Sequence, residues 1–177
     1  MPDFFKGNSL NALYEGLDPY GPEKVEIRRR FMKEHAAFDT NSSALIDLVP
    51  AIREVYPSVH KVGAFGLCWG GKVAVLGSIG EPALFHATGQ AHPGGLDKED
   101  AKALTVPHIC LASKDEAKDV VADYAEILSK HQGSIVETYD KMFHGWMGAR
   151  ANLEDEENRK EYERGYRQVA GFFSRYL

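Results

Sequence analysis

The spacing of apolar residues changes after about residue 60. Before that point, apolar positions recur three or four residues apart over residues 21–37 and 42–56, which predicts two helices. Pro22 suits the first turn of the former helix, and Pro50 predicts a kink in the latter. The opening residues 2–8 contain the turn formers Gly7 and Asn8, and they predict irregular structure.

After residue 60 the chain alternates between short apolar runs and helical patterns. Residues 62–67, 87–91, 108–112 and 134–139 predict four strands, and residues 71–80, 117–131 and 156–176 predict the helices between and after them. Such alternation is typical of an α/β protein, with a mostly parallel sheet covered by helices on both faces. At 177 residues the chain suits a single domain, residues 1–177.

Charge and hydropathy exclude several classes of function. The formal net charge of -5 leaves no basic surface for a polyanion, so we expect no nucleic-acid partner. No apolar run reaches the roughly 18 residues of a membrane span, and the N-terminus lacks the basic-then-apolar order of a secretory signal. Two cysteines in such a chain are expected to be reduced, and we predict a cytoplasmic protein without a membrane partner.

The junction between the first predicted strand and its helix carries a Gly-x-Cys-x-Gly turn centred on Cys68. This pattern is typical of a nucleophile elbow, in which glycines on either side let the helix pass close to the strand. The N-terminal field of the following helix favours a thiolate at such a position. The alternative is that Cys68 is a small buried hydrophobic residue at a glycine-rich junction.

Two later loops supply partners in the chain order of an α/β-hydrolase, which is nucleophile, acid and then histidine. Asp115 follows the third predicted strand, and His144 follows the fourth in an aromatic, glycine-containing loop. We therefore predict Cys68 as nucleophile, Asp115 as the acid and His144 as the base. Asp115 could instead cap the next helix, in which case Glu116 is the reserve acid.

Other reactive side chains have plainer interpretations. Cys110 lies inside an apolar strand and is predicted to be a core residue, whereas His92 leaves a strand at the same edge of the sheet and could line the pocket. The remaining histidines are expected to be structural or exposed: His35, His60, His86, His108 and His131. No spacing of His, Cys, Asp or Glu resembles a metal site, and no phosphate-binding loop is present, so we predict no metal and no cofactor.

Three motifs together carry a family resemblance: Gly-Leu-Cys-Trp-Gly-Gly at residues 66–71, Ala-Ser-Lys-Asp-Glu at residues 112–116, and Phe-His-Gly-Trp at residues 143–146. With these motifs and its amphipathic C-terminal helix, the chain resembles the dienelactone hydrolase family, particularly its fungal members. The resemblance implies a Cys-Asp-His triad at Cys68, Asp115 and His144. It also implies an α/β-hydrolase fold without a large cap domain.

The resemblance carries two further expectations. The family holds a substrate carboxylate with an arginine shortly after the histidine, which implies Arg150 here, at a somewhat longer spacing. The family also has several strands before the segment that residues 2–5 resemble, so the sheet is expected to be N-terminally shortened to about four strands. We then expect the strand of residues 62–67 to form an exposed edge, a second oxyanion donor to be missing, and copies of the chain to associate through that edge.

The expected reaction is hydrolysis of a small activated ester or lactone through a thioester acyl-enzyme. The backbone N–H of Trp69 would be one oxyanion donor, since it heads the helix after the nucleophile. A class I glutamine amidotransferase has a similar elbow but needs a later His-x-Glu pair, which the sequence lacks. The remaining alternative is a non-catalytic relative that retains the triad as a binding or regulatory domain.

Overall fold

The computed structural model describes residues 2–18, 21–80 and 82–177. Within residues 1–8, which the sequence predicted to be irregular from residue 2 onward, Met1 is the one residue outside the described ranges. The elements in chain order are α1 (Leu10–Leu13), α2 (Pro22–Glu34), α3 (Phe38–Val55), β1 (Gly63–Leu67), α4 (Trp69–Gly77), β2 (Ala87–Ala91), α5 (Lys98–Ala103), β3 (His108–Ser113), α6 (Lys118–Leu128), β4 (Ile135–Tyr139) and α7 (Glu156–Phe173).

The four strands form one sheet in the order β1-β2-β3-β4, and every neighbouring pair is parallel. The predicted α/β class, the parallel sheet and the four strands are therefore confirmed. β2 and β3 are buried along their whole length, because each has a strand on both sides and helices over the sheet. Parallel strands bring their carboxyl ends to one edge, so the loops after β1, β3 and β4 lie together.

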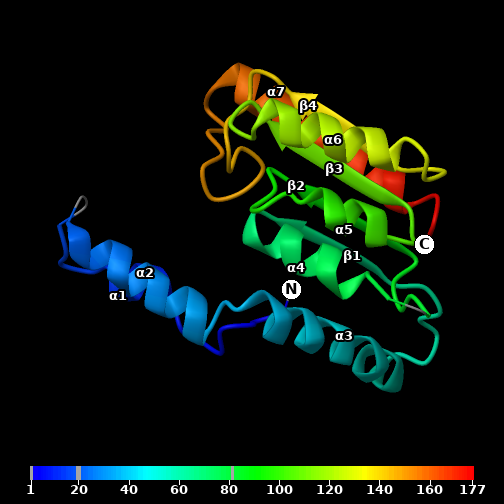
Figure 1. Cartoon of the computed structure of the whole chain (residues 1–177), viewed down its shortest axis with the longest axis horizontal. Coiled ribbons are helices and arrows are strands. Elements are labelled where there is room, and N and C mark those ends of the chain that lie inside the picture. The colour runs from blue at the N-terminus through cyan, green and yellow to red at the C-terminus, as the bar shows by residue number, and fades with distance from the viewer. Residues whose placement is uncertain (1, 19–20, 81) are drawn as a thin grey trace.

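Two apolar layers hold helices against the sheet. On one face Ile109 and Leu111 of β3 pack with Val169 and Phe172 of α7. On the other face Cys110 packs with residues of α4, α5 and α6, and Figure 1 shows these three helices in front of the sheet. The alternation of side chains along β3 is what allows one strand to contribute to both layers.

The N-terminal part departs most from the expectation. α3 begins at Phe38, earlier than predicted, and it continues without interruption past Pro50. The short helices α1 and α5 were not predicted, although Asp97 caps α5 by accepting a hydrogen bond from the Glu99 N–H. Figure 1 shows α1 and α2 reaching away from the sheet, while α3 packs beside α4.

β1 is an edge strand of this sheet, as predicted. The Val62 carbonyl accepts from His86 N–H and the Cys68 N–H donates to Ala91 carbonyl, so the even-numbered residues direct their backbone groups toward β2. Because backbone direction alternates along a strand, the N–H and C=O groups of Gly63, Phe65 and Leu67 point to the open side. Within the described ranges, no helix combines the length and apolar character needed to cross a membrane.

Candidate active site

Cys68 stands in the tight turn between β1 and α4, where the sequence places it. Its backbone has φ 51° and ψ -118°, a region that residues with a side chain rarely adopt. The turn is fixed because the Cys68 N–H donates to Ala91, while its carbonyl accepts from the N–H groups of Gly71 and Gly94. Such strain at a reactive side chain is a feature of nucleophile elbows.

The glycines of the elbow are not equivalent. A Cβ atom on Gly66 would lie 2.0 Å from the Gly70 carbonyl oxygen, and one on Gly71 would lie 2.8 Å from the Cβ of Gln90. A Cβ on Gly70 would meet nothing within 4 Å. The close approach of helix to strand therefore requires glycine at positions 66 and 71, whereas the motif alone suggests positions 66 and 70.

His144 reaches Cys68 from the loop after β4. Its Nε2 atom lies 3.0 Å from Cys68 Sγ, and its Nδ1 atom lies 2.8 Å from Oε1 of Glu116. The Glu116 carboxylate is nearly buried, and its other oxygen accepts a hydrogen bond from the Ser113 N–H. With Nδ1 donating to Glu116, Nε2 is free to accept the thiol proton, which is the arrangement a general base needs.

The predicted contact between Asp115 and the imidazole is wrong in this structure. Asp115 Oδ2 accepts a hydrogen bond from the backbone N–H of His144 at 2.8 Å, so this carboxylate holds the loop rather than the ring. Glu116, the reserve acid, occupies the ring position. Two adjacent acids at a strand end cannot be distinguished by sequence spacing, because the direction of each side chain depends on how the loop after β3 meets the loop after β4.

The backbone and the side chain of Trp69 make contacts in different parts of the structure. As the first residue of α4, its N–H has no carbonyl partner within the helix. Gly94 lies beside it, where a Cβ atom would come within 3.1 Å of the Trp69 nitrogen. The indole N–H donates to the Ala36 carbonyl, and the ring packs against Phe5. The N–H is thus available to an oxyanion, while the ring anchors the N-terminal segment.

Arg150 is directed at the histidine loop. Its Nη1 atom donates to the His144 carbonyl at 3.0 Å, and its guanidinium carbon lies 5.5 Å from the centre of the Phe143 ring. A Cβ on Gly145, whose φ is 97°, would lie 2.9 Å from the Arg150 side chain. The contacts that the structure shows for Arg150 therefore support the position of His144.

Three further titratable side chains are buried in the central part of the sheet or at its end: His92, His108 and Cys110. His92 is 2% exposed, its ring centre lies 5.1 Å from that of His144, and burial lowers its pKa to about 4. His108 is fully buried on β3, and burial lowers its pKa to about 3. Burial raises the pKa of Cys110, which is a core residue as predicted.

An apolar groove reaches Cys68 along the open side of β1. It has a volume of about 880 Å³. Its walls come from the N-terminal segment, α3, β1, α4 and α7, and include Phe4, Phe5, Leu48, Ile52, Trp69 and Tyr166. Sequence reasoning missed this groove, because its walls are far apart in the chain.

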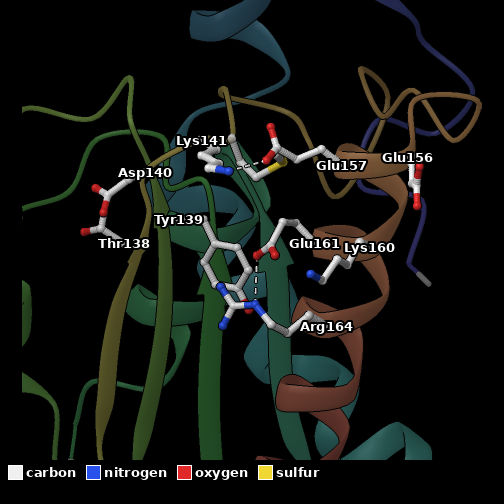
Figure 2. A pocket seen from close by; sticks show the side chains of 10 residues that line it. Thr138, Tyr139, Asp140, Lys141, Glu156, Glu157, Lys160, Glu161 and Arg164 are labelled. Carbon is white, nitrogen blue, oxygen red and sulfur yellow. Dashed lines mark hydrogen bonds and ion pairs between the residues drawn. The ribbon is translucent and has the colours of Figure 1, made fainter.

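A second cavity, of about 600 Å³, lies at the end of β4, and most of the residues that line it are charged. Figure 2 shows Lys141, Glu157 and Lys160 around it, with Arg164 beside the Tyr139 ring. Cys68, Glu116 and His144 do not line this cavity. In the described part of the chain, no group of three or more His, Cys, Asp or Glu side chains is suited to a metal ion.

A parallel sheet with a strained cysteine elbow, followed in chain order by an acid and a histidine, defines an α/β-hydrolase-like protein. The sequence pattern of the dienelactone hydrolase family matches residues 1–177, and the chain belongs to that family. It is similar to two Schizosaccharomyces pombe proteins described as uncharacterized AIM2 family proteins. One is 37% identical and the other 33%, and each match covers 98% of this chain and 69% of the yeast protein.

Proposed function

We propose that the chain, as a single domain, hydrolyses small activated esters or lactones with Cys68 as nucleophile, His144 as base and Glu116 as the acid that orients the base. The observation that carries the proposal is the continuous contact from Cys68 Sγ to His144 Nε2 and from His144 Nδ1 to Glu116. Nucleophile, base and orienting acid within hydrogen-bond reach are the signature of a covalent hydrolase.

In the proposed reaction, His144 takes the thiol proton and Cys68 attacks the carbonyl carbon. The Trp69 N–H stabilises the negative oxygen of the tetrahedral intermediate. Collapse of that intermediate expels the alcohol or enolate, which takes the proton from His144, and leaves a thioester on Cys68. Water, deprotonated by the same histidine, then attacks the thioester carbon. The carbon–sulfur bond breaks, the acid leaves, and the Cys68 thiolate takes the proton back from His144. An activated leaving group is favoured because, among the described residues, this one N–H is the oxyanion donor identified. Each such donor is typically worth about 3 kcal/mol of barrier.

The test is turnover of p-nitrophenyl acetate by the purified chain, followed by Cys68→Ala with folding checked by circular dichroism. We expect turnover with a burst of p-nitrophenol in the original chain and none above background in the variant. Turnover that survives Cys68→Ala would refute the proposed nucleophile. A folded original chain that turns over no ester would favour the alternative, a non-catalytic binding or regulatory domain of the same fold.

A matched pair of variants separates the two acids. Glu116→Gln removes the charge that orients the His144 ring, and we expect turnover to fall on the order of 10²-fold or more. Asp115→Asn leaves an oxygen that can still accept the His144 N–H, so we expect a loss of less than about tenfold. A larger loss at Asp115 than at Glu116 would restore Asp115 as the orienting acid.

We also propose that two copies of the chain associate through β1. An antiparallel pairing about a two-fold axis at Phe65 would put Gly63 of each copy opposite Leu67 of the other, and all three residues direct backbone groups outward. Sedimentation velocity over a range of concentrations should show a dimer in equilibrium with monomer. A monomer at every concentration would refute the pairing.

We propose, finally, that the protein is cytoplasmic, since both cysteines are free thiols.

A further inference from the structure

His92 combines two unfavourable features at one position. It follows β2 with φ 37°, a left-handed conformation that costs a residue with a side chain roughly 1 kcal/mol or more. It is also 2% exposed, and among the described residues neither of its ring nitrogens has a hydrogen-bond partner. A strained backbone and an unpaired buried polar group both lower stability, and natural proteins retain such features mainly at functional sites.

The surroundings of His92 point to the site. Its ring centre lies 5.1 Å from that of His144, and the two planes are inclined by 67°. Its backbone N–H donates to the Leu111 carbonyl on β3, which fixes the side chain at the end of the sheet. Nε2 of His92 is 3.9 Å from the Cβ position of Gly148, so the loop after β4 covers the ring. Glu116, from the loop after β3, and His144 are the titratable groups that act on it.

We propose that His92 is a positioning residue, whose aromatic ring holds the His144 imidazole between Cys68 and Glu116 and stabilises the imidazolium formed when Cys68 loses its proton. A cation that lies over the face of an aromatic ring, within about 6 Å of its centre, is attracted by the ring, and the attraction is larger when water is excluded. The ring centres of His92 and His144 lie within that distance. This inference rests on the proposed hydrolysis, because it assigns a role in generating the nucleophile.

The ring can support a cation only while it is itself uncharged. Burial, and next the neighbouring His144, lower the pKa of His92 to about 4, so His92 is neutral in the range where a cysteine hydrolase would work. A second positive charge beside the imidazolium would oppose it. Shape and aromatic character, rather than hydrogen bonding, are therefore what position 92 supplies.

The test compares His92→Phe with His92→Leu by alkylation of Cys68 with iodoacetamide from pH 5 to 9, with the modified cysteine identified by mass spectrometry. For His92→Leu we expect the alkylation rate at pH 6.5 to fall about three- to tenfold, and the midpoint of the pH profile to rise by about half to one pH unit. His92→Phe should stay within about twofold of the original chain. Where ester turnover is measured, His92→Leu should lower kcat with little change in KM.

Urea unfolding establishes that the variants are folded, and His92→Met replaces His92→Leu if the latter does not fold. A profile of the non-aromatic variant that superimposes on that of the original chain would overturn the proposal. So would a loss in His92→Phe as large as in the non-aromatic variant. Alkylation reports on the Cys68–His144 pair without any substrate. If the alkylation rates of the original chain and its variants follow the expected pattern but the original chain hydrolyses no ester, the proposed function is refuted and the role of His92 stands.

Discussion

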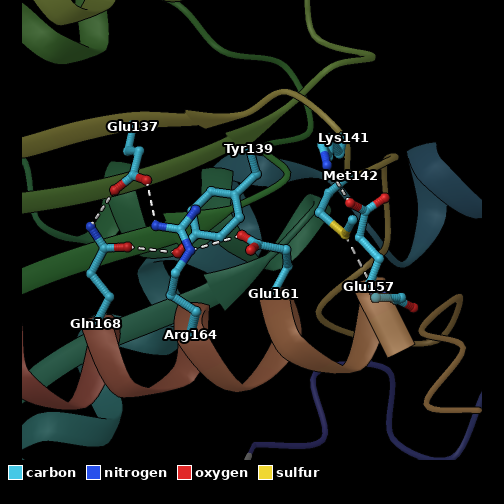
Figure 3. Close-up of polar contacts among 9 residues, drawn as sticks. Glu137, Tyr139, Lys141, Met142, Glu157, Glu161, Arg164 and Gln168 are labelled. Atoms are coloured by element: carbon cyan, nitrogen blue, oxygen red, sulfur yellow. Dashed lines mark hydrogen bonds and ion pairs between the residues drawn. The ribbon is translucent and has the colours of Figure 1, made fainter. Parts of the chain in front are cut away.

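The two edge strands of the sheet, β4 and β1, differ in the side chains that surround them. At β4, charged and polar side chains stand between the strand and α7: Glu137 accepts from Arg164 and Gln168, and Arg164 also binds Glu161. Figure 3 shows this network along the strand, with Arg164 beside the Tyr139 ring. The guanidinium carbon of Arg164 lies 3.8 Å from the centre of that ring. Charged side chains are a common device that keeps an edge strand from pairing with other chains.

At β1 no such device is present. The strand is Gly-Ala-Phe-Gly-Leu, without a charge, and its open side faces an apolar groove. Outward backbone groups beside apolar walls favour another extended chain over a lipid or a small hydrocarbon, because only a strand satisfies the donors and acceptors. The comparison teaches that the two edge strands differ in charge, and the uncharged β1 is the edge through which we propose that copies of the chain pair.

The largest difference between the two regions should come from glycine replacements. Gly66→Ala in β1 forces its Cβ against the Gly70 carbonyl, so we expect a loss of more than about 3 kcal/mol in the free energy of unfolding, measured with urea. Gly171→Ala in α7 meets nothing within 4 Å and should stabilise the chain by about 0.5–1 kcal/mol. Similar stabilities for both variants would contradict the tight elbow.

The next effect concerns association. Leu48→Lys places a charge in the groove beside β1, and we expect the dimer dissociation constant in sedimentation experiments to rise at least about tenfold. Val55→Lys is the control, because Val55 lies on the same helix, is 67% exposed and does not line the groove. Equal weakening by both variants would mean that the added charge, rather than the groove, matters.

Acid should also destabilise the folded chain through two histidines buried between the two edges. The pKa values of His92 and His108 lie near 4 and 3 in the folded chain, below the ordinary 6.5, so the unfolded chain binds more protons as the pH falls below 6.5. Stability should therefore decrease from pH 6.5 toward pH 4. Urea midpoints measured across this range should fall less steeply in His92→Phe, and an unchanged slope would argue against a neutral buried His92.

The smallest effect is expected at the β4 edge itself. Arg164→Met removes the partner of Glu137 and Glu161 but keeps an apolar stem over Tyr139, and the ion pairs are partly exposed. We expect a loss of about 0.5–1 kcal/mol in urea unfolding and no change in sedimentation. A marked gain of self-association would show that Arg164 also protects this edge.

The sequence predicted the candidate site residues through local patterns. The Gly-x-Cys-x-Gly turn indicated the elbow at Cys68, where the close approach of helix and strand does require Gly66. The loops after β3 and β4 supplied His144 and a pair of candidate acids in the right order. The strand positions followed from short apolar runs. α1 and α5 went unpredicted because helices of so few residues carry too little periodicity to be recognised.

Only the tertiary structure decided how these residues meet. Glu116 rather than Asp115 reaches the imidazole, since the register of two loops separated by 28 positions sets which carboxylate points inward. Arg150 turns onto the His144 loop, and His92 lies against the His144 ring, for the same reason. Side-chain direction in a loop depends on contacts distant in the chain, which a local pattern does not contain. The sequence alone determined which side chains were candidates for the site, and the packing of the loops after β2, β3 and β4 determined which of their atoms meet.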